Sequence, residues 1–117
     1  MQERLQLSSV RIAEIRGPRF TYGSLSVDWC RGAISTATTS VTLLRTELRL
    51  LGALLETAGE PVNSRLLIRR TWPDATYELT KQYALRTYMR SLRRRLNLLG
   101  VRGKLVTVRG IGYRFRP

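Results

Sequence analysis

Arginine and threonine side chains recur at helical spacing in the second half of this sequence. Successive gaps of four, three and four residues place a tyrosine and three of these side chains on one face of a helix: Tyr83, Thr87, Arg90 and Arg94. A guanidinium group binds the edge of guanine through two hydrogen bonds, and a threonine contacts a base edge or the methyl group of thymine. This face therefore predicts a helix that enters the major groove of DNA.

Further polar side chains flank this face. Arg86 and Arg93 lie on one side, while Ser91 and Arg95 lie toward the other. Flanking arginines suit phosphate oxygens, whose contacts set the register of a protein on the duplex. The opposite stripe is apolar and predicts the buried side of the helix: Leu85, Met89, Leu92 and Leu96. A basic helix face alone is more often simply solvated, so the interpretation depends on the elements around it.

Basic residues also mark the C-terminal tail, which alternates in polarity over residues 104–115 around the turn residues Gly110-Ile111-Gly112. This pattern predicts a β-hairpin. Arg109 stands directly before the turn and Arg114 follows it. Because negative potential in a narrow minor groove attracts arginine, a basic hairpin tip beside a recognition helix predicts a second DNA contact.

Positive charge is concentrated in the same half of the chain. The 117 residues carry a net charge of +13, and residues 63–117 contain fourteen Lys and Arg against Asp74 and Glu78. The first 62 residues are nearly balanced. This asymmetry indicates a binding face for a polyanion rather than a general solubility charge.

The composition excludes most catalytic and metal chemistry. The sequence has no histidine and a single cysteine, Cys30, so it cannot form a Ser-His-Asp device or a structural zinc site of the usual composition. Asp74 and Glu78, four residues apart, are the remaining acid–base pair, but charged loop residues are far commoner than catalytic carboxylates. We expect no enzyme activity, no metal site and no cofactor.

The rest of the chain predicts the elements that position these residues. Four short segments are of strand type: 20–22, 25–28, 33–36 and 40–43. A first helix is predicted over 46–58, and a second one begins after the cap residue Asn63 and is ended by Pro73. Thr80 is the predicted cap of the third helix, which extends to about Leu99. Sheet, three helices and hairpin indicate an α+β domain with helix-turn-helix order.

Two of these segments resemble a known family. Residues 107–115, Thr-Val-Arg-Gly-Ile-Gly-Tyr-Arg-Phe, look like the C-terminal signature of OmpR/PhoB-family effector domains, and Leu-Arg-Arg-Arg-Leu at 92–96 resembles the basic motif of their recognition helix. Glu47, Gly59 and Trp72 also match in order and spacing. The resemblance covers about residues 20 to 116. It implies a winged helix-turn-helix with an N-terminal four-stranded antiparallel sheet, a three-helix core and a C-terminal hairpin wing. It also implies sequence-specific binding of double-stranded DNA as the output domain of a two-component response regulator.

The resemblance carries over to individual positions. Thr87, Arg90, Ser91 and Arg94 fall at or beside base- and phosphate-contacting positions, and Arg109 falls at the minor-groove position of the wing. The run 83–88, Tyr-Ala-Leu-Arg-Thr-Tyr, departs from the family's frequent Arg-Thr-Val-Asp-Val-His, so the preferred DNA sequence does not carry over. The family further implies that loop 73–80 contacts RNA polymerase, and that a receiver domain and a sensor-kinase pathway belong to any longer protein.

Several expectations about organisation accompany this interpretation. Residues 1–19 are predicted to be a linker or N-terminal extension, and residues 20–117 the DNA-binding domain. We expect no membrane partner, a cytoplasmic location on the nucleoid, a monomer in solution and a head-to-tail pair of copies on DNA. Two alternatives stay open from the residues alone: a winged helix that binds RNA or single strands, and one whose basic face meets an acidic protein.

Overall fold

A small antiparallel sheet opens the fold. The structure, a computed structural model, describes residues 19–57, 59–74 and 78–116, so the predicted linker lies outside it except for Arg19. Four strands pair in the order β1-β2-β3-β4: β1 Arg19–Tyr22, β2 Leu25–Asp28, β3 Ala33–Ser35 and β4 Ser40–Thr42. Because side chains alternate along a strand, Leu25, Val27 and Ile34 enter the core while Ser26 and Ser35 lie on the outer face. The predicted sheet is confirmed.

Three helices follow: α2 Arg45–Leu55, α3 Ser64–Thr71 and α4 Gln82–Leu98. α2 ends earlier than predicted, and Ala58, its expected last residue, lies outside the described residues. The Thr57 backbone N–H bonds the carbonyl of Leu54 three residues before it, and the Thr57 hydroxyl donates to the same oxygen at 2.9 Å. A side chain that competes for a helix carbonyl in this way closes the last turn.

The starts of the next two helices differ in how well they were predicted. Asn63 is the N-cap of α3, as expected, and its side chain accepts the backbone N–H of Arg65 at 2.7 Å. Thr80 is not the cap of α4, so that prediction is wrong. A 3-10 turn, Glu78–Lys81, precedes the helix and places Lys81 at the N-cap position.

The C-terminal hairpin is built on a third strand that the sequence did not predict. β6 Leu105–Val108 and β7 Gly112–Phe115 form the expected hairpin, and β5 Val62–Asn63 pairs with the other edge of β7. The order β5-β7-β6 fastens the hairpin to the start of α3. A two-residue strand has no periodicity of its own, because its pairing partner lies about fifty residues away in the chain.

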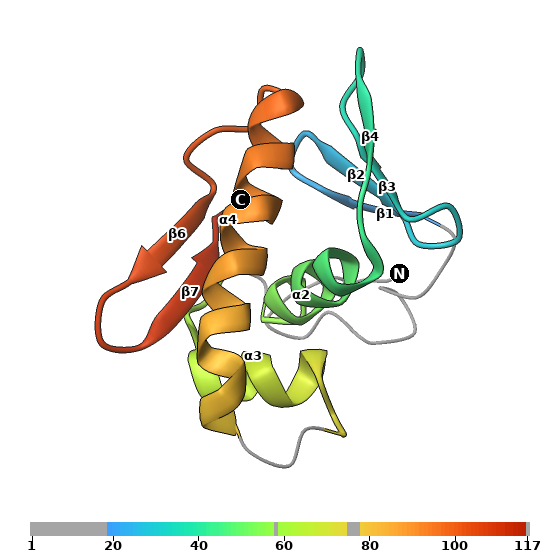
Figure 1. The fold of residues 1–117 in the computed structure, drawn as a ribbon. Coiled ribbons are helices and arrows are strands. Elements are labelled where there is room, and N and C mark those ends of the chain that lie inside the picture. Colours follow the sequence, from blue (N-terminus) through green and yellow to red (C-terminus); the bar gives the residue numbers. More distant parts are fainter. Residues whose placement is uncertain (1–18, 58, 75–77, 117) are drawn as a thin grey trace, which may run out of the picture.

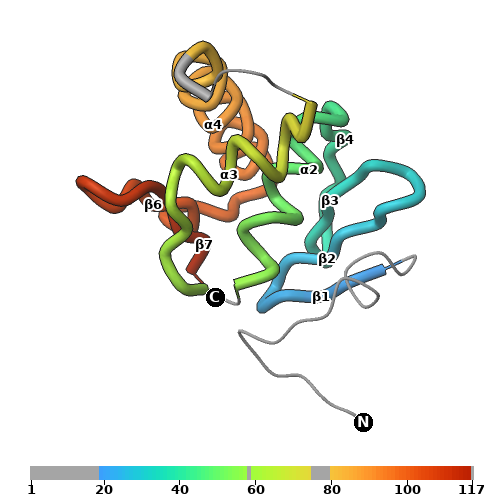
Figure 2. The backbone as a smooth tube through the Cα atoms, turned by 90° about the horizontal axis from the view of Figure 1, so that it is seen from below, coloured from blue at the N-terminus to red at the C-terminus, as the bar shows by residue number. Residues whose placement is uncertain are grey.

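α4 lies between the two sheets. In Figure 1 the hairpin β6–β7 flanks one side of α4, α2 and the N-terminal sheet lie on the other, and α3 crosses below. Figure 2, turned by 90°, shows the hairpin projecting from the opposite side of the molecule to β1–β4. The shared core contains Leu54 of α2, Leu67 of α3, Leu92 of α4 and Phe115 of β7, all fully or almost fully buried. This arrangement is the predicted winged helix-turn-helix.

Candidate nucleic-acid interface

The apolar stripe predicted for α4 is buried, which leaves the opposite face in solvent. The buried residues are the four that were predicted: Leu85, Met89, Leu92 and Leu96. The exposed residues include five predicted site residues: Tyr83, Arg86, Thr87, Arg90 and Arg94. Tyr83 is 74% exposed at the start of the helix. The face therefore lies as the helical spacing required.

The exposed arginines are not engaged within the domain. Among the residues that the structure describes, Arg86, Arg90 and Arg94 make no hydrogen bond or ion pair. The Thr87 hydroxyl donates to the backbone carbonyl of Tyr83 at 3.1 Å and keeps its lone pairs available as acceptors. Each guanidinium thus keeps all five N–H donors for a partner.

Ser91 lies at the edge of the face and is half-buried. Its hydroxyl donates to the Oε2 carboxylate oxygen of Glu47 on α2. The structure thus turns this predicted site residue toward the inside of the domain.

Arg93 connects α4 with the wing. Its Nε donates to the backbone carbonyl of Leu105 at 3.2 Å, and one terminal nitrogen donates to the hydroxyl of Thr107 at 3.3 Å. Both partners belong to β6. Arg93 therefore holds the hairpin beside the helix with part of its guanidinium and retains other N–H groups for a phosphate.

The two predicted wing residues differ in their surroundings. Arg109 is exposed at the end of the hairpin, beside Gly110 in a left-handed conformation with φ of 79°. Arg114 is half-buried, and its Nε donates to the carbonyl of Gly59 at 2.9 Å. Of these two, Arg109 alone is exposed, in the turn of the hairpin.

One functional candidate was missed from sequence. Glu47 is a charged residue with 0% exposure, and it gathers Ser91 and Arg95 of α4 around its carboxylate. A signal existed, since Glu47 stands one turn before the leucines of the buried face of α2. The sequence could not show which arginine would reach it.

The part of the chain that the structure describes has no competing chemical site. Within the described ranges, no three His, Cys, Asp or Glu side chains are gathered as metal ligands would be, and no helix is long and apolar enough to cross a membrane. Burial raises the pKa of Tyr22, whose hydroxyl donates to the carbonyl of Phe115 at 3.4 Å, but this residue joins β1 to β7 inside the fold.

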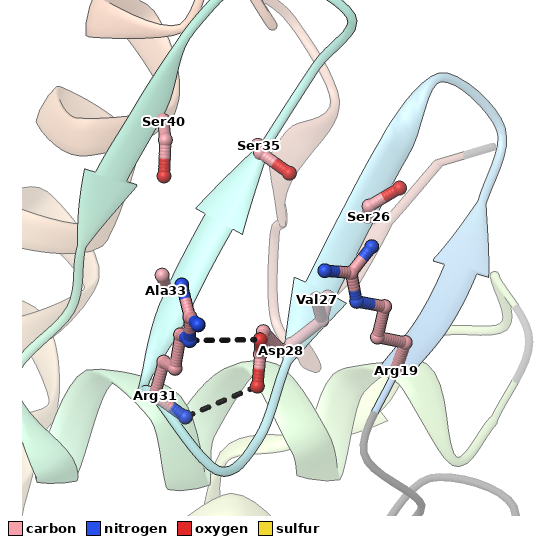
Figure 3. Close-up of a pocket in the computed structure, with 8 residues that line it drawn as sticks. All are labelled: Arg19, Ser26, Val27, Asp28, Arg31, Ala33, Ser35 and Ser40. Atoms are coloured by element: carbon pink, nitrogen blue, oxygen red, sulfur yellow. Dashed lines mark hydrogen bonds and ion pairs between the residues drawn. The ribbon is translucent and has the colours of Figure 1, made fainter.

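A shallow pocket of about 180 Å³ lies on the outer face of the N-terminal sheet. Figure 3 shows Arg31 turned toward Asp28, with serines lining the strands and the Arg19 side chain lying across the face. The pocket combines short polar side chains with one exposed ion pair, Arg31–Asp28 at 3.9 Å. Such a pair contributes little energy, so the pocket has no distinctive chemistry.

Comparison with known proteins decides the family. The family model described as "Transcriptional regulatory protein, C terminal" matches residues 38–115. The chain belongs to this family. Members of this C-terminal domain family are DNA-binding transcription regulators rather than enzymes, which confirms the predicted class of function.

Individual members support the assignment of this regulator domain. It is 33% identical over 99 residues to the KDP operon transcriptional regulatory protein KdpE of Escherichia coli (strain K12), covering 84% of this chain and 43% of KdpE. The chain thus spans less than half the length of that relative. Among solved structures, the C-terminal domain of the nisin resistance regulator NsrR is 28% identical with a TM-score of 0.70, over 81% of this chain and 93% of that one.

A further solved structure supports the fold. The DNA-binding domain of RstA from Klebsiella pneumoniae, in complex with the RstA box, has a TM-score of 0.70 at 22% identity, over 86% of this chain and 99% of that one. Together with the family match, these neighbours confirm the resemblance to OmpR/PhoB response-regulator domains.

Proposed function

We propose that this domain binds specific sites on duplex DNA by inserting α4 into the major groove and the tip of the β6–β7 wing into an adjacent minor groove. The observation that carries the proposal is the row of exposed, unengaged arginines on α4, directly opposite its buried stripe. An α-helix fits the major groove, and arginine there reads guanine bidentately. The RstA domain, which shares this fold, was solved in complex with the RstA box, and this supports the proposal.

The site residues divide into two groups by their surroundings. Thr87, Arg90 and Arg94 read base edges from the centre of the exposed face, with Tyr83 and Arg86 beside them. Ser91 contributes through its inward bond, and Arg109 enters the minor groove. The second group contacts phosphates and consists of two residues that also hold the domain together, Arg93 and Arg114. Contacts of the second kind set register rather than sequence.

Further proposals concern the partners beyond DNA. KdpE is more than twice as long as the segment it shares with this chain, so we propose that the domain is the output half of a response regulator whose receiver domain lies outside residues 20–117. Pro73 and Asp74 are exposed at the start of loop 73–80, as a contact with RNA polymerase requires. We further propose a cytoplasmic protein on the nucleoid that is monomeric in solution and pairs on DNA.

The scarcity of exposed aromatic residues among the described residues favours duplex DNA over single strands. Proteins that bind single strands stack successive bases on several aromatic side chains. Among the described residues, Tyr83 is the one aromatic side chain that is largely exposed. An acidic protein partner would use the same charges but would not need arginines in helical register with Thr87.

Selection of bound duplexes from random DNA, followed by competition with RNA, single strands and poly-glutamate, tests the proposal. We expect one enriched motif, and duplex DNA should be the best competitor. The logarithm of the binding constant should fall with the logarithm of the salt concentration, with a slope of about −0.9 per phosphate contacted. No enriched motif, or preferential competition by single strands or polyanionic peptide, would contradict it.

A further inference from the structure

A buried carboxylate ties α4 to the rest of the domain at the level of the reading arginines. Glu47 of α2 has 0% exposure. Its Oε1 accepts the backbone N–H of Leu44 at 2.8 Å and lies 2.8 Å from Nε of Arg95, in an ion pair without hydrogen-bond alignment. Its Oε2 accepts the hydroxyl of Ser91. Charged side chains are rarely buried without partners, and here the partners are the N-cap residue of α2 and two residues of α4.

The two α4 partners of Glu47 lie where they determine the direction in which the exposed face of the helix points. Ser91 and Arg95 are one helical turn apart, and each directly follows a reading residue, Arg90 or Arg94. Because neighbouring residues differ by about 100° around a helix, holding Ser91 and Arg95 inward fixes the direction in which the arginines before them point.

The apolar stripe alone fixes this direction less firmly. Burial of leucine and methionine is favourable in many rotations and small shifts of a helix, because the hydrophobic effect is not directional. Charge-assisted hydrogen bonds are short and directional, and the bond from the Ser91 hydroxyl to Glu47 is of this kind. The network also extends to the N-terminal sheet, since a terminal nitrogen of Arg95 donates to the backbone carbonyl of Thr42 at the end of β4, at 3.3 Å.

We propose that Glu47 is a positioning residue for DNA recognition: through Ser91 and Arg95 it sets the rotation and register of α4, and thereby the alignment of Arg90 and Arg94 with the bases. This inference rests on the proposed function, because it concerns how selectively the same face reads DNA. Glu47 itself touches no DNA, since its side chain is wholly enclosed.

The test compares Glu47→Gln with Glu56→Gln, a matched control. Glu56 also forms a carboxylate–arginine pair, with Arg70, but that pair does not involve α4. For each variant, affinity is measured for the selected duplex and for a scrambled duplex of the same length, with folding checked by near-ultraviolet circular dichroism and a thermal melt. We expect Glu47→Gln to lower the ratio of the two affinities about tenfold or more, the size of a misplaced base contact, with little change in the salt slope. Glu56→Gln should leave the ratio as in the wild type.

A purely structural role gives a different result. It lowers both affinities in proportion to the folded fraction and leaves their ratio unchanged, and that outcome overturns the proposal. A wild-type protein that prefers no duplex overturns the proposed function instead.

Ser91→Ala keeps the test decisive if Glu47→Gln does not fold, because it removes one neutral donor and leaves the Glu47–Arg95 pair intact. Its effect is measured against duplexes substituted one base pair at a time. Selectivity lost across all positions that α4 reads supports positioning. Loss of selectivity at one base pair alone assigns Ser91 a direct contact with DNA. No loss of selectivity shows that the Glu47 network plays no part in recognition. Both results overturn the proposal.

Discussion

Single arginines in this domain differ in what already holds them. Arg93 and Arg114 donate to backbone carbonyls of the protein, so part of their hydration has been replaced during folding. Arg90, Arg94 and Arg109 are exposed and make no hydrogen bond or ion pair among the described residues. A free guanidinium can exchange water for a base edge without breaking a protein contact, so recognition energy should concentrate on unengaged arginines of this kind.

Arg90→Ala and Arg94→Ala should each weaken binding to the selected duplex by about 1–3 kcal/mol, the value of a bidentate base contact, and should relax preference at one base pair. Fluorescence anisotropy titrations against specific and scrambled duplexes measure this. Arg31→Ala in the β2–β3 turn removes an equally charged, exposed side chain and should change binding little. Unchanged affinity in both α4 variants would mean that another face of the helix meets DNA.

Arg109→Ala should reduce affinity most on sites with A·T-rich flanks, because a narrow minor groove has the most negative potential. Titration of one core site with A·T-rich or G·C-rich flanks measures the difference. Arg116→Ala, another exposed arginine of the C-terminal tail, serves as the control. Equal losses on both flanks would identify Arg109 as an ordinary phosphate contact.

Among the elements, the wing depends on contacts made far along the chain. β7 lies between β6 and β5, and the Ser64 N–H donates to the carbonyl of Ile111 at 3.1 Å, so the hairpin is joined to the start of α3. Arg93 joins the same hairpin to α4. The direction of the wing is therefore set by its attachments to both helices.

Gly112→Ala should detach the wing from β5. A Cβ atom at this position would lie 2.1 Å from the carbonyl oxygen of Val62 and 2.7 Å from the backbone nitrogen of Ser64, so the backbone must move apart. We expect Gly112→Ala to lower the free energy of unfolding by about 1–3 kcal/mol or more, and by more than its control does, as measured by urea denaturation. Gly110→Ala is the control in the same hairpin, because its Cβ would meet nothing within 4 Å and its cost comes from the left-handed φ alone, about 1–2 kcal/mol. Equal or smaller loss for Gly112→Ala would show that β5 and β7 separate without cost.

For the whole molecule, charge rather than an apolar surface governs assembly. With a net charge of +13, two copies repel each other in solution, and the duplex neutralises that repulsion. Among the described residues, the large hydrophobic side chains that are exposed are far apart in the chain: Leu44 precedes α2, Tyr83 and Leu98 lie at opposite ends of α4, and Ile111 lies in the turn of the hairpin. No extended apolar patch of this part of the chain therefore favours a dimer without DNA.

Two copies should bind repeated sites cooperatively only when the repeats lie on the same side of the duplex. We expect strong pairing at a spacing of about one helical turn, 10–11 bp, and weak pairing at half-turn offsets. Titrations of two-repeat duplexes with varied spacing measure this, with a single-repeat duplex as the reference. Pairing that ignores helical phase, or a dimer in light scattering without DNA, would rule out this form of assembly.

Local patterns determined most of the fold. The four strands, the N-cap Asn63 and the buried stripe of α4 follow from alternation, capping chemistry and helical period, which act between residues close in sequence. For the same reason the exposed face of α4, with Arg90 and Arg94 on one side of the helix, follows from the order of the amino acids alone.

Contacts between distant residues were decided by the tertiary structure alone. β5 exists because Val62 meets Tyr113, Ser91 turns inward because Glu47 lies beside it, and Arg93 bonds β6 rather than solvent. A sequence shows that a serine or arginine can donate a hydrogen bond, but not which acceptor is near once the chain has packed. The division of basic side chains between those that hold the domain together and those that stay free for a partner is therefore a property of the folded molecule, because it depends on which carbonyls and carboxylates folding brings within reach.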